Sequence, residues 1–352
     1  MHTDKKPTGG ETADRPELRS TFRTRGWLLK LLKLSLGVAI VAWLVGSGRL
    51  DLTVVSRALG SWPQLLLLLA ILYLTVGITS WRWQILLGAQ QIPMGLIECF
   101  SVSMIGLVLG LATPAGAGGE VARIYLVQRH AGRKMGAVIS TVVFDRLLGL
   151  LSLLLLGGVT LAMNRQLVLE NAAFLRLGGV VGVAIIGGFA FLAGAICLSA
   201  PASSRLHRLA ERLPILRGFV PFLDAVACYR NAPLVIVVAL LLSLLSQVAI
   251  CGSFALLLHL MGSRAMSVSA ILATVPVALI ATMIPLTPAS IGAGQIAFFT
   301  LFQLTSGRGS DGANAFTLYQ CVYLIMSLTG LAFYLRSKSP IPHSLEAEAS
   351  LP

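Results

Sequence analysis

Four charged residues of this sequence lie in or beside apolar stretches, in positions where they could bind an anion or exchange protons. Glu120 and Arg123 follow a glycine-rich turn, and Asp145 and Arg146 lie within an apolar run that begins at Met135. An arginine can hold a phosphate through two parallel hydrogen bonds. Ionisable groups at membrane depth are costly and are usually kept for a task. These residue types together predict a site for an anionic headgroup, with Glu120 and Asp145 as the carboxylates available for protons.

The order of these charges along the chain restricts how they can pair. Adjacent side chains of a helix point about 100° apart, so Asp145 and Arg146 cannot aim at one partner in the same direction. We expect Asp145 to pair with Arg123 or another basic group, and Arg146 to pair with Glu120. Two structural alternatives stay open: a purely structural network of ion pairs, and a local pair at the helix start between Glu120 and Arg123.

The glycines before Glu120 allow two interpretations. Gly116, Gly118 and Gly119 could let backbone N–H groups face a phosphate at the start of a helix. They could instead only permit a tight turn between two helices. No Gly-Lys-Ser/Thr follows them, so a nucleotide-binding P-loop is not predicted.

The elements that must position these residues are membrane helices. The chain has 352 residues, of which 56% are hydrophobic and only 12% charged, which is far more apolar than a water-soluble domain. Apolar runs near the roughly 20 residues that span a bilayer recur along it. The predicted full spans are Trp27–Gly46, Pro63–Trp81, Met135–Leu161, Phe174–Leu198, Pro233–Leu260 and Ala313–Leu335.

Two further apolar regions are interrupted by Gly and Pro. Leu96–Ala112 is followed by a turn and a shorter helix from Glu120, and Val268–Leu286 is followed by a similar turn and a helix from Gln295. Asp145 follows Glu120 at the same spacing at which Gln320 follows Gln295. Such interruptions at matching places predict two inverted halves, about 63–161 and 233–335, around a mid-membrane site. Gln295 and Gln320 are candidate substrate contacts there, although hydrogen bonding between helices would also explain them.

The 27 Lys and Arg residues predict which side each loop occupies, because basic loops stay in the cytoplasm. If each interrupted region is a hairpin that returns to its own side, most of these residues fall on one side, with both termini there. The tails 1–26 and 336–352 are then cytoplasmic, and the connector 201–230 is a basic loop or a set of helices on the membrane surface. In this scheme Trp81, Arg82 and Trp83 form an interfacial belt. A cleaved N-terminal signal peptide is the less favoured alternative.

The residues from Gly110 to Gly149, together with Pro285 to Gln295, resemble the lysylphosphatidylglycerol synthase transmembrane-domain family of flippase-like proteins. The resemblance covers most of Trp27 to Leu335 and implies a multi-pass protein of the bacterial inner membrane that moves a lipid between leaflets. Larger members carry a cytosolic aminoacyltransferase domain; only a short tail follows Arg336, so we expect a stand-alone membrane domain. The family usually has Glu where this chain has Gln295, so this chain must function without a carboxylate at that position.

We therefore expect an all-α membrane protein of six full spans and two broken or re-entrant hairpins in an inverted repeat. Its expected function is to move an anionic phospholipid or a polyprenyl-phosphate-linked substrate through a central polar cavity. Neither an enzyme nor a nucleic-acid partner is expected, and the five cysteines have no metal-binding spacing, so no metal or cofactor is predicted. Three alternatives remain: an enzyme that modifies lipid headgroups, an accessory subunit of a lipid or glycolipid synthase, and a small-solute transporter. A homo-oligomer is also open.

Overall fold

The computed structural model describes residues 46, 60–111, 113, 117–131, 135–170, 172–198, 228–263, 266–283 and 290–336. All regular structure in these ranges is helical. Outside the described residues lie the predicted first span except Gly46, the connector as far as residue 227, and both tails except Arg336.

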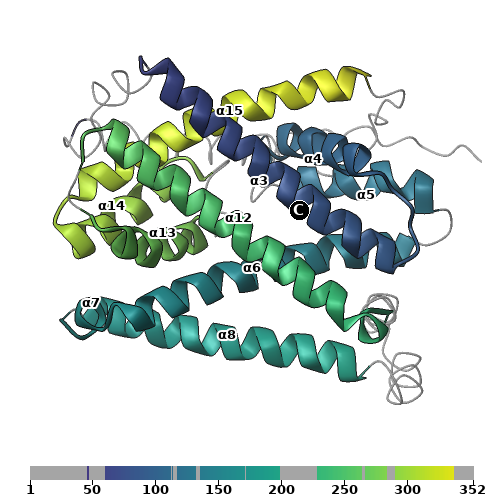
Figure 1. Ribbon diagram of the computed structural model, residues 1–352, viewed down its shortest axis with the longest axis horizontal. Coiled ribbons are helices and arrows are strands. Elements are labelled where there is room, and N and C mark those ends of the chain that lie inside the picture. The colour runs from purple at the N-terminus through teal and green to yellow at the C-terminus, as the bar shows by residue number, and fades with distance from the viewer. Residues whose placement is uncertain are drawn as a thin grey trace, which may run out of the picture.

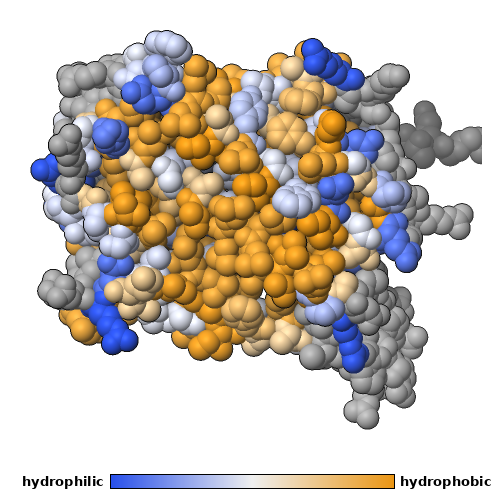
Figure 2. Space-filling model, viewed as in Figure 1, coloured by the Kyte–Doolittle hydropathy of each residue, from blue (hydrophilic) through white to orange (hydrophobic). Residues whose placement is uncertain are grey.

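Five long apolar helices lie at the places where five of the six spans were predicted, and each is long enough to cross a membrane. Helices of 27 to 29 residues reach roughly 40 Å at 1.5 Å per residue, more than the hydrocarbon core of about 30 Å. Figure 2 shows a broad apolar face with hydrophilic residues gathered toward two opposite ends. The chain is therefore an all-α membrane protein. The five are α3 (Trp62–Ala89), α6 (Met135–Met163), α8 (Ala172–Leu198), α12 (Pro233–Leu260) and α15 (Gly309–Arg336).

Both interrupted regions form pairs of short helices. They are α4 (Leu96–Leu111) with α5 (Ala117–Ala131), and α13 (Val268–Thr282) with α14 (Ala293–Ser306). Helices of 14 to 16 residues are roughly 21–24 Å long, too short to span the hydrocarbon alone. The helices of each pair pack against one another. Each interrupted region is therefore a helical hairpin.

The described helices repeat the same four-element pattern twice. Helices α3 to α6 contain 28, 16, 15 and 29 residues, and α12 to α15 contain 28, 15, 14 and 28. Their packing is also reciprocal, since α3 packs on α12, α6 packs on α13 and α15 packs on α4 (Figure 1). The predicted halves therefore correspond to two copies of one four-helix arrangement.

The two copies run in opposite directions along the bundle. Tyr229, directly before α12, donates a hydrogen bond to the carbonyl of Leu86 near the end of α3, at 3.1 Å. Cys251 and Leu257, in the second part of α12, pack in the same cluster as Leu68 near the start of α3. Helices α3 and α12 are therefore antiparallel, as an inverted repeat requires.

The glycine Gly330 allows one of the reciprocal crossings. A Cβ atom at Gly330 of α15 would lie 2.2 Å from the carbonyl oxygen of Met104 in α4, so only glycine lets these helices approach so closely. The related crossing of α6 and α13 brings Gly157 to Pro276. Close approach at these residues fixes the hairpin of each half against the last helix of the other.

Helix α8 and the short helix α7 (Arg165–Glu170) lie between the repeats in sequence and at one side of the molecule in space (Figure 1). Helix α8 packs chiefly on α6 and α7. Most of its apolar side chains are exposed, including Val183 and Ile186. It covers α6 from outside and contributes no residue to the charged cluster described below.

Candidate functional site

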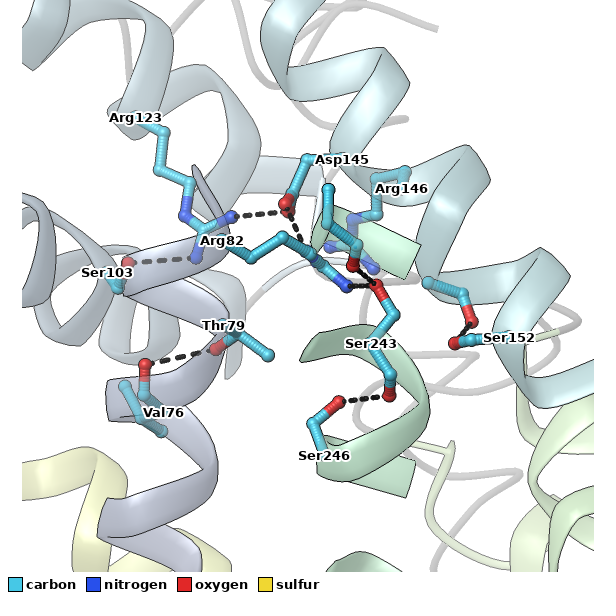
Figure 3. Close-up of polar contacts among 12 residues, drawn as sticks. Val76, Thr79, Arg82, Ser103, Arg123, Asp145, Arg146, Ser152, Ser243 and Ser246 are labelled. Carbon is cyan, nitrogen blue, oxygen red and sulfur yellow. Dashed lines mark hydrogen bonds and ion pairs between the residues drawn. The ribbon is translucent and has the colours of Figure 1, made fainter. Parts of the chain in front are cut away.

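A buried ion pair between α3 and α6 lies at the centre of the charged residues. Arg82 Nε lies 2.7 Å from Asp145 Oδ1, and both side chains are buried. Arg82 also donates from Nη1 to Ser243 Oγ of α12 at 2.6 Å, so this one guanidinium joins the two halves (Figure 3). Its Nη1 atom would lie 3.6 Å from a Cβ atom at Gly149, so the guanidinium lies over that glycine.

Arg123 of α5 is the second cation beside Asp145. Its Nη1 lies 3.6 Å from Asp145 Oδ2, and its Nη2 donates to Ser103 Oγ of α4 at 3.0 Å. The guanidinium also lies over the ring of the buried Trp83, 5.0 Å from its centroid, which is a favourable cation–π geometry. The predicted pairing of Asp145 with a basic group is confirmed, and two arginines share the carboxylate.

The predicted pair of Arg146 with Glu120 is also confirmed. Arg146 donates from both Nε and Nη2 to Glu120 Oε1, with the Nε bond at 2.8 Å. This pair is less buried than the first, since 48% of the Arg146 side chain and 21% of the Glu120 side chain are exposed. Glu120 Oε2 is buried and has no hydrogen-bond partner in the described part of the chain. The alternative local pair between Glu120 and Arg123 is not observed among these ion pairs.

The packing of α4 against α5 places Glu120 and Arg123. A Cβ atom at Gly119 would lie 2.3 Å from the carbonyl oxygen of Gly106, so the two helix backbones meet at this glycine. The N–H of Gly118 donates to Thr113 Oγ1 at 2.8 Å. The structure thus favours close packing over phosphate binding as the role of these two glycines. Gly116 lies outside the described residues.

The equivalent residues of the second half are neutral and lie in a separate network. Gln295 Nε2 donates to Gln320 Oε1 at 2.7 Å and to Thr317 Oγ1 at 3.3 Å. Gln295 Oε1 accepts from the N–H of Gly292, whose φ of 84° suits glycine. Gln295 is buried, so hydrogen bonding between helices accounts for it. The sequence spacing shared by Glu120/Asp145 and Gln295/Gln320 corresponds to a side-chain contact only in the second half, between Gln295 and Gln320. In the first half, Glu120 binds Arg146 and not Asp145.

Arg82 is the residue that the sequence analysis missed. The prediction of an interfacial belt was wrong, because α3 continues to Ala89 and the Arg82 side chain is buried inside the bundle. Trp83 is fully buried, and only Trp81 of the three is substantially exposed. The signal was present in the apolar residues after Trp83, which extend the span beyond the two tryptophans. Asp145 supplies the countercharge that lets an arginine lie there.

The cluster holds three guanidinium groups and two carboxylates, which leaves one formal positive charge in excess. Arg82, Arg123 and Arg146 supply the cations, and Asp145 and Glu120 the anions. An excess cation inside a membrane bundle attracts an anion, and the exposed Arg146 offers donors to one. The arrangement can bind a phosphate-bearing group, and the buried, unpaired Glu120 Oε2 can accept a hydrogen bond or a proton.

Comparison with known proteins places the whole bundle in one family. No curated protein and no solved structure gives a significant match. The model of the family described as lysylphosphatidylglycerol synthase TM region matches residues 30–330, which include all of the charged cluster. This chain therefore belongs to the lysylphosphatidylglycerol synthase TM region family and is a multi-pass membrane protein with a lipid-related role.

Proposed function

We propose that this protein moves an anionic lipid, or a lipid-linked intermediate, between the two leaflets of a bacterial inner membrane. The observation that carries the proposal is the half-exposed pair of Arg146 and Glu120 in the middle of the bundle. Arg146 lies roughly 15 Å from the start of α6, a depth at which hydrocarbon would surround an exposed side chain. Charged groups at that depth face protein or a polar space. A lipid headgroup that enters the same space would meet both charges.

The unequal burial of the two ion pairs suggests a division of roles. Arg82 and Asp145 are buried and joined to Ser243, so they hold α3, α6 and α12 together. Arg146 takes no part in the buried pair of Arg82 and Asp145, and its guanidinium is partly exposed. Glu120 Oε2 has no partner among the described residues. The phosphate of the headgroup would bind Arg146 with help from Arg123, while the acyl or polyprenyl tails stay in lipid.

The proposed transport forms and breaks no covalent bond, so the protein is not an enzyme. The sequence contains no nucleotide-binding P-loop. The energy would come from the proton gradient, the membrane potential or consumption of the delivered lipid. In this scheme both hairpins are re-entrant, and both termini lie in the cytoplasm.

Leaflet exchange in proteoliposomes tests this function. Labelled phosphatidylglycerol is followed with wild type, Arg146→Gln, Glu120→Gln and empty vesicles. We expect wild type to exceed empty vesicles, and each variant to lose roughly tenfold or more of that excess, because a charge-assisted hydrogen bond contributes about 1.5–3 kcal/mol. Arg176→Gln is the matched control, since Arg176 is an exposed arginine of α8, outside the cluster.

Two outcomes would contradict the proposal. Equal rates in wild-type and empty vesicles would remove the transport function. Equal rates in wild type, Arg146→Gln and Glu120→Gln would remove this site. Mass spectrometry of the same lipids tests the alternative that the site modifies lipid headgroups, because a chemically changed headgroup would show that the protein is an enzyme.

A further inference from the structure

Helix α13 contains a proline near its middle, at the place where it crosses α6. Pro276 is one of its 15 residues. Proline has no backbone N–H, so the carbonyl of Leu272, four residues earlier, has no partner within the helix, and the proline ring crowds that carbonyl. Sharp bends of helices occur mostly at such prolines. Pro276 therefore divides α13 into a first part, residues 268–275, and a second part, residues 277–282.

A threonine of α6 supplies the partner that the proline removes. Thr160 Oγ1 lies 2.9 Å from the carbonyl oxygen of Leu272, to which it donates. The same Oγ1 lies 2.7 Å from the carbonyl oxygen of Leu156 and 3.1 Å from that of Gly157, both in its own helix. A hydroxyl has one proton, so it serves one of these carbonyls fully at a time. When the proton turns to Leu156, the carbonyl of Leu272 is released.

The two parts of α13 are bound to different halves of the molecule. The first part accepts the bond from Thr160, and its Ser269 carbonyl also accepts from Nδ2 of Asn164, directly after α6, at 3.4 Å. At the end of the second part, the carbonyl of Thr282 accepts from Ser290 Oγ at 2.7 Å. Ser290 precedes α14, which packs on α15. The proline thus lies where α13 passes from α6 of the first half to α14 and α15 of the second.

The equivalent crossing in the first half lacks this arrangement. Helix α4 contains no proline, and its Met104 carbonyl lies so close to α15 that a Cβ atom at Gly330 would be 2.2 Å from it. At the crossing of α13 with α6, a Cβ atom at Gly157 would lie 3.5 Å from Pro276, an ordinary van der Waals distance. The first crossing is held by backbone contact, whereas the second leaves room for a change of angle.

We propose that α13 bends at Pro276 when the two halves move relative to each other, and that the Thr160 hydroxyl controls this hinge. The inference rests on the proposed function, because a substrate that crosses between leaflets requires a site that opens to each side in turn. In the bent state the hydroxyl serves its own helix, and water between the helices satisfies the released carbonyl. The hydroxyls of Thr274 and Thr305, 3.1 Å apart, also join α13 to the end of α14, so this contact loosens in the same step.

Pro276→Ala tests the hinge, because alanine restores the N–H and lets the helix run straight. Exchange of labelled phosphatidylglycerol in proteoliposomes should slow by roughly three- to tenfold, since bending now breaks an ordinary hydrogen bond. The melting temperature Tm should stay the same or rise. Pro233→Ala is the matched control, because Pro233 begins α12, where a proline ring leaves no helix carbonyl without its partner. Its exchange rate should equal that of wild type.

Thr160→Val tests the control by the hydroxyl, because it keeps the shape and leaves the Leu272 carbonyl unpaired. It should lower the Tm by roughly 2–10 °C, whereas Thr160→Ser should keep it near that of wild type. In the Pro276→Ala background, Thr160→Val should lower the Tm by less than half as much, since the N–H of residue 276 then serves that carbonyl. Thr75→Val is the matched control, because Thr75 donates to Ile71 of its own helix at 2.9 Å. Its effect should be equal in both backgrounds.

Spin labels measure the bend directly. Met283→Cys labels the end of the second part of α13, and Ile139→Cys labels an exposed position of α6, in a chain without its native cysteines. Distances between the two labels in liposomes should form a broad or double distribution in wild type. Pro276→Ala should give a single, narrower distribution.

Each contrary result has a separate meaning. Equal exchange rates, or equal distance distributions, in wild type and Pro276→Ala overturn this inference and leave transport itself intact. A Tm of Pro276→Ala well below that of wild type also overturns it, because the proline then acts in packing. Equal effects of Thr160→Val in both backgrounds overturn the control by the hydroxyl. Wild-type exchange no faster than in empty vesicles overturns the proposed function, and the distance distributions then decide the hinge alone.

Discussion

Replacing Asp145 with asparagine should destabilise the protein more than removal of either arginine beside it. The Asp145 carboxylate lies between two arginines, with Arg82 at 2.7 Å and Arg123 at 3.6 Å. Asparagine keeps the size of the side chain and removes its charge. The variant therefore leaves two guanidinium groups close together without the anion between them.

The expected magnitude follows from this geometry. Breaking a buried ion pair by removing one partner costs about 3–5 kcal/mol, because it leaves an uncompensated buried charge. Asp145→Asn should fall at the upper end of that range, since it leaves two. Arg123→Gln removes the excess positive charge and leaves a neutral pair of Arg82 and Asp145, so it should be the mildest of the three. Arg82→Gln should lie between them, because Arg123 still partners the carboxylate and Ser243 loses its donor.

The differences in free energy of unfolding between each variant and wild type can be measured by denaturant or thermal unfolding of the purified protein, followed by intrinsic fluorescence. The double variant Arg82→Gln/Asp145→Asn should be less destabilised than the sum of its single variants by more than about 0.5 kcal/mol, the usual limit of additivity for independent sites. Asp311→Asn is the matched control, because Asp311 accepts a hydrogen bond from Ser263 near the start of α15, outside the cluster. It should cost about 1–2 kcal/mol.

Two results would refute this reasoning. If Asp145→Asn leaves the stability no lower than Arg123→Gln does, the carboxylate does not balance the arginines. If the single effects of Arg82→Gln and Asp145→Asn add, the two side chains act independently.

Two other predictions concern the hairpins. Gly119→Ala should destabilise the protein by about 1–3 kcal/mol in the same unfolding assay, because its Cβ atom would overlap the carbonyl of Gly106. Gly178→Ala is the control: it has open space around it inside a helix, so it should not destabilise the protein. Gly116→Cys and Ser290→Cys each place a single cysteine in one hairpin of a chain without its native cysteines. These cysteines should react with a membrane-impermeant reagent from opposite sides of the membrane, or be shielded from it. Free reaction of both from the same side would contradict two re-entrant hairpins of opposite orientation.

Hydropathy and helix-breaking residues predicted most of the described fold. The apolar run Pro233–Leu260 predicted helix α12 with its observed bounds. The Gly/Pro interruptions predicted the positions of both hairpins. The pair of Arg146 and Glu120 was predictable because charges in apolar spans require partners and few were available. These features depend on local composition or on a strong energetic constraint.

The contacts of Arg82 were not predictable on those grounds. Tryptophans on both sides of an arginine are typical of a membrane interface. The apolar residues after Trp83 extend the span past this arginine, but the rotation of α3 and the position of Asp145 decide that its side chain points into the bundle. Its other partner, Ser243, lies 161 residues further along the chain. The rotation of each helix about its axis is set by packing across such distances. The separation of Gln295 from the charged cluster has the same origin.

The division of chemistry between the repeated halves has a consequence for directionality. Two identical halves related by a twofold axis in the membrane plane would give a substrate the same energy profile from either leaflet. Here Arg82, Arg123, Asp145 and Arg146 belong to the first half, while the second half has Gln295 and stacked rings. In the proposed transport, an anion entering from one face would therefore meet a different sequence of charges from one entering at the other. The fold is nearly symmetric, but its charged groups are concentrated in one of the two halves.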